Sequence, residues 1–199
     1  MKAKIKNYSV QFIKEIIPVI AGILIALFID NWNSQQKDKA YIHQVFSTID
    51  SELKESKEEL ANKMPKQQAL IDSLNRYANN NNISFQDIIL KSDGVHIPQI
   101  RINAWKSIAN TKIDLIDYRK IALLSNIEEL KETLNNKSDF LMNFMYSNFN
   151  TTDKNVKATA KLILMDIITT EKTIQETIDY FEESDIRKQH PDSRQNLSF

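Results

Sequence analysis

The side chains best able to do chemistry in this chain do not fall into the spacings that a catalytic or metal site requires. Its three histidines, His43, His96 and His190, lie far apart, and none belongs to an HxxxH, HExxH or ExxH pattern. The chain has no cysteine, which removes thiolate metal sites, iron–sulfur clusters and a cysteine nucleophile. No serine lies in a G-x-S-x-G turn. We therefore predict that the protein is not an enzyme and has no catalytic residue, metal site or cofactor.

The acidic residues gather on segments that also carry lysines. Glu52, Glu55, Glu58 and Glu59 alternate with Lys54 and Lys57. At three- and four-residue spacing such side chains pair on a solvated helix face, which is the role we expect for them. The chain has 26 Lys+Arg and 26 Asp+Glu, so it lacks the basic excess of a nucleic-acid-binding protein. We expect no nucleic-acid partner.

One irregular segment is the best candidate for a binding surface. Gly94 and Pro98 interrupt any helix there, and the same segment carries His96, Arg101 and Trp105. A surface formed by these three side chains could recognise a partner or a ligand. The alternative is that Trp105 fills the end of a helical bundle. The sequence leaves both interpretations open.

An apolar stretch near the N-terminus is the most specific feature of the chain. Residues 16–29 carry no charge, and the flanking residues extend this stretch to a helix over 9–32. Such a helix crosses a hydrocarbon core of about 30 Å, with Tyr8 and Trp32 near the two interfaces. A cleaved signal peptide and a buried core helix are the alternatives. No small-x-small cleavage pattern follows, and a core helix is rarely apolar all round, so we expect a retained single-pass anchor.

The lysines around this helix predict its orientation. Four lysines precede the apolar stretch, whereas Lys37 and Lys39 follow it with Asp38 between them. The positive-inside rule then places residues 1–8 in the cytoplasm and residues from 33 onward outside. In a bacterial inner membrane, the outer residues 33–184 would form a periplasmic domain. No other segment is comparably apolar, so we expect one span.

One face of the membrane helix combines small and polar residues. At about 100° per residue, Glu15, Val19, Gly22, Ala26 and Asn33 share one stripe. Gly22 and Ala26 form a small-xxx-small pair, which lets two membrane helices approach closely. Glu15 either reaches the lipid headgroups or is paired in an interface with another membrane helix. We take the stripe as a candidate interface.

The rest of the chain has the periodicity of helices. Apolar residues at three- and four-residue steps predict a helix from about 8 to 64, ended or turned by Pro65. Further helices are expected over about 66–78, 84–90, 104–109, 117–149 and 153–183, with N-caps at Ser84 and at Thr152 or Asp153. Residues 185–199 are polar and are expected to form a flexible tail. The pattern predicts an all-α fold with an antiparallel bundle of about four main helices, formed within one chain or completed by a second copy.

Two blocks of the sequence resemble a known family. They are EIIPVIAGILIALFIDNWN, residues 15–33, and NAWKSIANTKIDLI, residues 103–116. Both are similar to a domain-of-unknown-function family of small single-pass membrane proteins from Bacteroidota, whose members carry Glu, an apolar stretch, GILIAL and then Asn/Asp-Asn-Trp-Asn. The sequence departs from that pattern at Pro18, Phe28 and Asp30. The resemblance implies the membrane topology and no mechanism.

Together these features predict a non-catalytic accessory or scaffold subunit of the bacterial inner membrane. Its partners would be the lipid bilayer and other membrane or periplasmic proteins, or a second copy of the chain. One alternative is a sensor of a periplasmic ligand that signals through a partner, because the cytoplasmic segment is too short for an output domain. Another is a proton-linked motor or transport subunit that uses Glu15.

Overall fold

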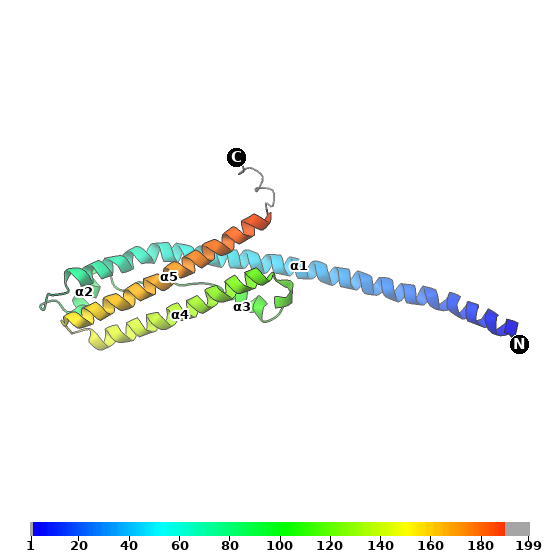
Figure 1. Cartoon of the computed structure of the whole chain (residues 1–199), viewed down its shortest axis with the longest axis horizontal. Coiled ribbons are helices and arrows are strands. Elements are labelled where there is room, and N and C mark those ends of the chain that lie inside the picture. Colours follow the sequence, from blue (N-terminus) through cyan, green and yellow to red (C-terminus); the bar gives the residue numbers. More distant parts are fainter. Residues whose placement is uncertain (1, 190–199) are drawn as a thin grey trace, which may run out of the picture. The chain divides into compact units, whose positions relative to one another are not determined.

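The computed structural model describes the backbone of residues 2–189 and the side chains of residues 12 and 14–184. All regular structure in that range is helical (Figure 1). The elements are α1 (Lys2–Arg76), α2 (Phe85–Lys91), α3 (Asn103–Ala109), the 3-10 turn η1 (Ile113–Leu115), α4 (Tyr118–Asn148) and α5 (Lys154–Gln189). The predicted all-α fold is confirmed over the described residues.

The chain divides into two compact units, residues 1–46 and 47–199, which we call the N-terminal unit and the helical domain. In the N-terminal unit the large apolar side chains of α1 are exposed, among them Ile17, Leu24 and Phe28. Among the described residues, α1 is the one helix long and apolar enough to cross a membrane, and no side chain of its apolar window is buried. The prediction of one such helix near the N-terminus is confirmed.

Helix α1 passes through Pro65 without a break, so the prediction that this proline ends the helix is wrong. The separate helix expected over 66–78 is the last part of α1. A proline inside a helix costs about 3 kcal/mol, because it removes a backbone hydrogen bond and crowds the preceding turn. Fully burying one leucine side chain gains about 1.5–3 kcal/mol. Leu60 before the proline and Leu70 after it are both buried, so packing on the inner face offsets the exposed proline on the outer face.

Three long helical segments contribute most of the core of the helical domain. They are α1 from residue 47 onward, α4 and α5, and each carries buried residues at alternating steps of three and four, as coiled coils do. These buried residues, which we call the seam, are Ile49, Leu53, Ser56, Leu60, Gln67, Leu70 and Leu74 on α1; Leu124, Ile127, Leu134, Ser138, Leu141 and Met145 on α4; and Lys157, Ala160, Leu164, Ile167, Glu171, Ile174, Ile178 and Phe181 on α5.

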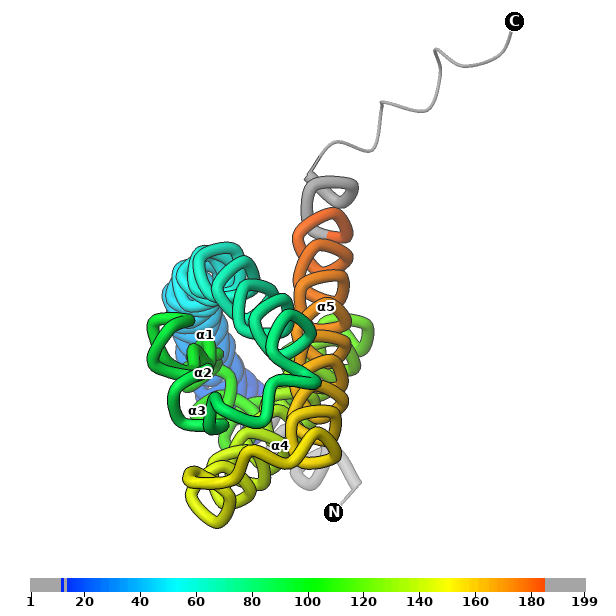
Figure 2. Tube along the Cα trace, turned by 90° about the vertical axis from the view of Figure 1, so that its left-hand side faces the viewer, coloured from blue at the N-terminus to red at the C-terminus, as the bar shows by residue number. Residues whose placement is uncertain are grey.

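Helix α5 runs antiparallel to both of its long neighbours. Lys57 on α1 lies 2.7 Å from Glu182 of α5, and further along α1 Gln67 contacts Glu171, which lies earlier in α5. Residues 149–153 join α4 directly to α5, and the two helices lie side by side (Figures 1 and 2). Consequently α1 and α4 run in the same direction, and the chain must return along α1 before α4 begins.

An extended segment makes this return. Residues 95–102, which we call the strap, have no regular secondary structure. Pro98, Ile100 and Ile102 are buried whereas Gln99 is exposed, the alternation of an extended chain with one face on a core. The expectation of an irregular or extended segment between the two short helices is confirmed.

Local sequence signals set several of the helix ends. Ser84 caps α2 as predicted: its hydroxyl accepts the N–H of Asp87 at 3.1 Å, and the Asp87 carboxylate accepts the N–H of Ser84. Of the two caps considered for α5, Asp153 accepts the N–H of the residue two positions later at 2.6 Å. After α2, Asp93 and Gly94 take positive φ angles of 62° and 89°, and this left-handed turn leads into the strap.

Helix α5 continues to Gln189, so it ends about six residues later than expected and includes residues 185–189 of the predicted tail. No glycine or proline interrupts that stretch, and Pro191 is the first helix breaker. The rest of the predicted tail, 190–199 with His190, lies outside the described residues.

Candidate functional site

Polar side chains of α1 hold the strap in place. The guanidinium of Arg101 pairs with the Glu55 carboxylate, and the backbone N–H of Arg101 donates to the Ser56 hydroxyl at 2.8 Å. Just beyond the strap, the N–H of Ala104 donates to Glu52 at 3.0 Å. Glu52 is half-buried against the start of α3, so the predicted solvated position is wrong for this residue, whereas Glu55 stays exposed as predicted but pairs with Arg101 and not with a lysine of its own helix.

The expected pairing of lysines with carboxylates on the same helix also fails at Lys57. Its ammonium group lies 2.6 Å from Asp179 and 2.7 Å from Glu182, both on α5. Hydrogen bonds to these two carboxylates raise the pKa of Lys57 above its usual value. Lys57 therefore joins two long helices of the domain.

Trp105 lies inside the domain and not on a surface. Only 1% of the residue is exposed, and its indole N–H donates to the Glu128 carboxylate of α4 at 3.0 Å. The other oxygen of Glu128 lies 3.2 Å from the ammonium of Lys106. The burial of Trp105 contradicts its interpretation as part of a recognition surface, and the alternative that it fills the end of the bundle stays a prediction.

His96 is half-buried, and the strap brings it to α1 through its backbone. Its carbonyl oxygen accepts a hydrogen bond of 2.8 Å from the side-chain amide of Gln67. The ring Nε2 lies 3.6 Å from Asp93 and makes no hydrogen bond. His96, Arg101 and Trp105 therefore do not form one surface. The Arg101 side chain pairs with Glu55 of α1, whereas the Trp105 side chain is buried inside the domain.

A buried polar cluster lies where the strap, α1 and α5 meet. Gln67 is 1% exposed and Glu171 is 0% exposed. The Gln67 amide donates one N–H to Glu171 Oε1 at 2.6 Å and the other to the carbonyl oxygen of His96. Gln67 Oε1 and Glu171 Oε2 are buried as well, and neither has a hydrogen-bond partner among the described residues. Unsatisfied buried oxygens of this kind are rare in folded proteins, which makes the cluster a candidate functional site.

Burial has a large effect on the Glu171 carboxyl. It raises the pKa of this group from its usual value of 4.5 to about 7. The hydrogen bond from Gln67 has the opposite, smaller effect and lowers the pKa. Lys137 on α4 does not neutralise the carboxyl, because its ammonium is bound to Asp166 and Thr170. Glu171 is therefore a group that can gain or lose a proton near neutral pH inside the seam.

Lys157 is the second buried charged residue of α5. Its ammonium donates to the backbone carbonyl of Tyr77 at 3.1 Å and to that of Asn80 at 2.8 Å. These carbonyls follow the last turn of α1, where a positive charge is favourable. Burial lowers the pKa of Lys157 below its usual value. The role of this side chain is to close the end of α1 against the start of α5.

Sequence reasoning missed the residues of the buried cluster. The signal was present, since Glu171 occupies a seam position between Ile167 and Ile174, and Gln67 occupies one between Leu60 and Leu70. The predicted stripes followed apolar residues alone and passed over the polar residues that share their spacing. A charged residue in register with an apolar stripe is the pattern that would have found Glu171.

The predicted membrane stripe is exposed along its whole length. Its five residues all lie on α1 and are exposed: Glu15, Val19, Gly22, Ala26 and Asn33. A Cβ atom added at Gly22 would meet no atom within 4 Å. The use of this stripe as an interface stays a prediction.

Among the described residues, no group of three or more His, Cys, Asp or Glu side chains could hold a metal ion. Comparison of the chain with models of protein families, with curated proteins and with solved structures finds no match. The resemblance to the Bacteroidota family therefore stays a prediction.

Proposed function

We propose that the chain is a single-pass protein of the bacterial inner membrane whose helical domain acts as a non-catalytic accessory or scaffold subunit. Residues 1–8 lie in the cytoplasm, residues 9–32 cross the membrane and the helical domain binds other envelope proteins in the periplasm. One observation carries this proposal: the exposure pattern changes along α1. Apolar side chains are exposed on every side of residues 17–32, whereas a single buried stripe begins at Ile49. The first pattern suits lipid and the second suits a protein core.

The absence of cysteine allows a sharp test of topology. Single cysteines introduced as Ser47→Cys and Lys2→Cys would report the two sides of the membrane. A membrane-impermeant maleimide added to cells with a permeabilised outer membrane is expected to label Ser47→Cys and to spare Lys2→Cys until the inner membrane is opened. The opposite labelling would reverse the orientation, and labelling of both sites in intact spheroplasts would refute a membrane anchor.

The binding role has its own test. A photo-crosslinking residue placed at Gly22, on the small-residue stripe, should give discrete crosslinked products in the native membrane. The same residue placed at Ile23 faces another side of the helix and serves as the control. A chain that purifies alone in mild detergent, and gives no crosslinked product at either position, would contradict the scaffold proposal.

A sensor is the second candidate, because α1 is one continuous helix that includes both the apolar segment and Gln67. Two alanines inserted after Lys39 would rotate the residues that follow by about 200° relative to those that precede. A scaffold with independent binding sites should retain its co-purified partners after this insertion. A sensor that transmits rotation or register through α1 should lose its output.

A further inference from the structure

The contact between Gln67 and Glu171 leaves two buried oxygens that one proton could satisfy together. The two side chains already share an N–H···O bond of 2.6 Å, and the remaining oxygen of each has no partner in the part of the chain that the structure describes. A protonated carboxyl can donate to an amide oxygen while it accepts from the amide nitrogen, which gives two parallel hydrogen bonds. An ionised carboxylate only accepts, so it leaves both remaining oxygens unsatisfied.

We propose that Glu171 and Gln67 form a proton-operated latch between α5 and α1, closed when Glu171 is protonated and weakened when it is ionised. The latch includes the strap, because the second N–H of the Gln67 amide donates to the carbonyl oxygen of His96. It is independent of which partner the domain binds.

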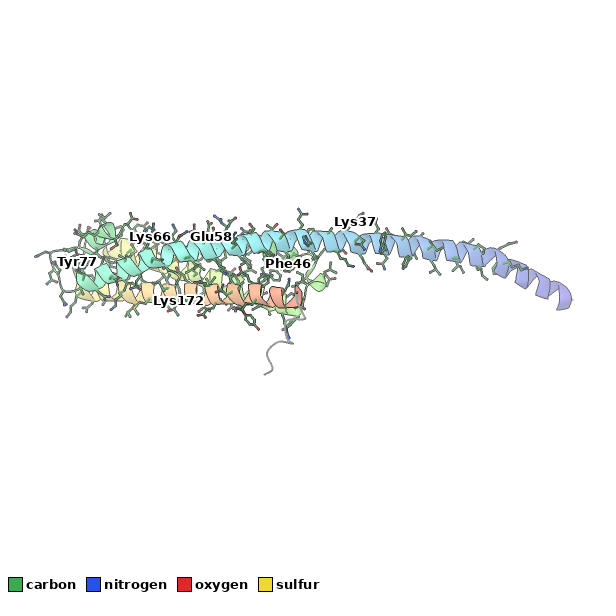
Figure 3. All side chains as sticks on the ribbon, turned by 90° about the horizontal axis from the view of Figure 1, so that it is seen from above. Lys37, Phe46, Glu58, Lys66, Tyr77 and Lys172 are labelled. Atoms are coloured by element: carbon green, nitrogen blue, oxygen red, sulfur yellow. The ribbon has the colours of Figure 1, made fainter. Side chains whose placement is uncertain are left out.

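The charged side chains near the latch do not neutralise an ionised Glu171, so this carboxyl loses its charge by taking up a proton. On α1 and α5, the neighbouring Lys66 and Lys172 are exposed and lie along the outside of the domain (Figure 3). On α4, the ammonium of Lys137 is engaged by two side chains of α5. On the strap, the ring Nε2 of His96 is buried and has no hydrogen-bond partner among the described residues, and the carboxylate of Asp93 lies 3.6 Å from it. Burial is the larger cause of the raised pKa of Glu171, about 7, and the Gln67 hydrogen bond only partly opposes it.

The sign of the pH effect follows from this shift. The pKa of Glu171 is higher in the folded domain than in the unfolded chain, so the folded state holds its proton to a higher pH. The contribution to stability is complete below about pH 4.5 and is lost progressively as the pH rises to about 7. One pKa unit is a factor of ten, so the unfolding constant should rise roughly 300-fold across that window. Above it, the contribution of Glu171 should not change further.

The test compares the full chain with Glu171→Gln in detergent micelles between pH 4 and pH 8. Trp105 fluorescence in a Trp32→Phe background reports the unfolding of the domain by urea. Glu171→Gln keeps the shape of the side chain, stays neutral and can donate to Gln67 Oε1. The unfolding constant of the parent should rise roughly 300-fold between pH 4 and pH 8, and we expect most of this rise to be absent in Glu171→Gln. Glu176→Gln, at an exposed position of the same helix, is the matched control and should follow the parent.

A second measurement uses the unchanged protein and does not depend on how the variant folds. Infrared spectra at pH 6 should contain the carbonyl stretch of a protonated carboxyl that resists exchange into deuterated water, and this band should fade as the pH rises through 7. Two results would overturn the latch: the absence of that band at pH 6, or equal pH dependence of stability in the parent and in Glu171→Gln.

Discussion

Replacing Lys157 by methionine tests the closure at the end of α1. Methionine preserves most of the length and the apolar stem of lysine but removes its ammonium group. Two hydrogen bonds are lost, of 3.1 Å to the carbonyl of Tyr77 and 2.8 Å to that of Asn80. The substitution also relieves the desolvation of a buried charge, whose presence is indicated by the lowered pKa of Lys157. The two effects have opposite signs.

Their magnitudes decide which effect dominates. A hydrogen bond from a charged donor contributes about 1.5–3 kcal/mol, so the pair contributes about 3–6 kcal/mol before opposing terms are subtracted. Replacing a buried ion by an apolar residue can recover about 1–4 kcal/mol. Asn80 is exposed, so water replaces part of what its carbonyl loses. We expect Lys157→Met to destabilise the domain by about 1–3 kcal/mol, roughly a 5-fold to 150-fold rise in the unfolding constant.

The assay is urea unfolding of the full chain in micelles, followed by Trp105 fluorescence in a Trp32→Phe background. The chain has two tryptophans, so this background leaves only the buried one to report. Lys154→Met makes the same chemical change at an exposed position one turn earlier and should alter stability by less than about 0.5 kcal/mol. Equal or greater stability of Lys157→Met would refute the reasoning, because relief of desolvation would then exceed the loss of both hydrogen bonds.

Three further substitutions probe other parts of the molecule. Pro65→Ala restores a backbone hydrogen bond in the middle of α1 and should raise the urea midpoint, by up to about 3 kcal/mol of stability; a lower midpoint would mean that the proline is needed for packing. Ile102→Ala in the strap should destabilise by about 2–5 kcal/mol, whereas its exposed neighbour Gln99→Ala should change little, and similar effects would show that the strap does not belong to the core. Gly22→Ile should reduce crosslinking between membrane helices more than Ile23→Leu does, and unchanged crosslinking would make the small-residue stripe a lipid-facing surface.

Local and periodic signals predicted most of the elements. The caps at Ser84 and Asp153, and the helical breaks at Gly94 and Pro98, depend on a few neighbouring residues and were readable from the sequence. The effect of Pro65 could not be predicted from the sequence, because it depends on the burial of Leu60 and Leu70 and on contacts with distant segments, such as that of Gln67 with Glu171. Whether a proline that costs a few kcal/mol locally ends a helix therefore depends on packing against distant parts of the chain.

The candidate site was predicted less well than the fold. Arg101 and His96 were singled out for their types, but their contacts are with α1, more than twenty residues earlier. Glu171 was passed over because carboxylates are usually solvated, although its seam position departs from that rule. Pairings such as Gln67 with Glu171, 104 positions apart, depend on the register of antiparallel helices. A single sequence does not specify that register.

The return of the chain through the strap also has a consequence for the order of folding. Contacts between α4 and α5 join residues 29 positions apart at Lys137 and Asp166 and 61 apart at Lys120 and Phe181, whereas α1 meets α5 across 104 to 125 positions. Loop closure favours the nearer pair, so α4 and α5 should form a helical hairpin first, and pulse-labelled hydrogen exchange should protect their amides before those of α1. During synthesis at about 5–20 residues per second, the buried face of α1 waits about 5–20 s for α5 to emerge. For that interval the side of the α1 seam that faces α5 has no partner from its own chain, and it is then that the protein is most open to aggregation or to capture by a chaperone.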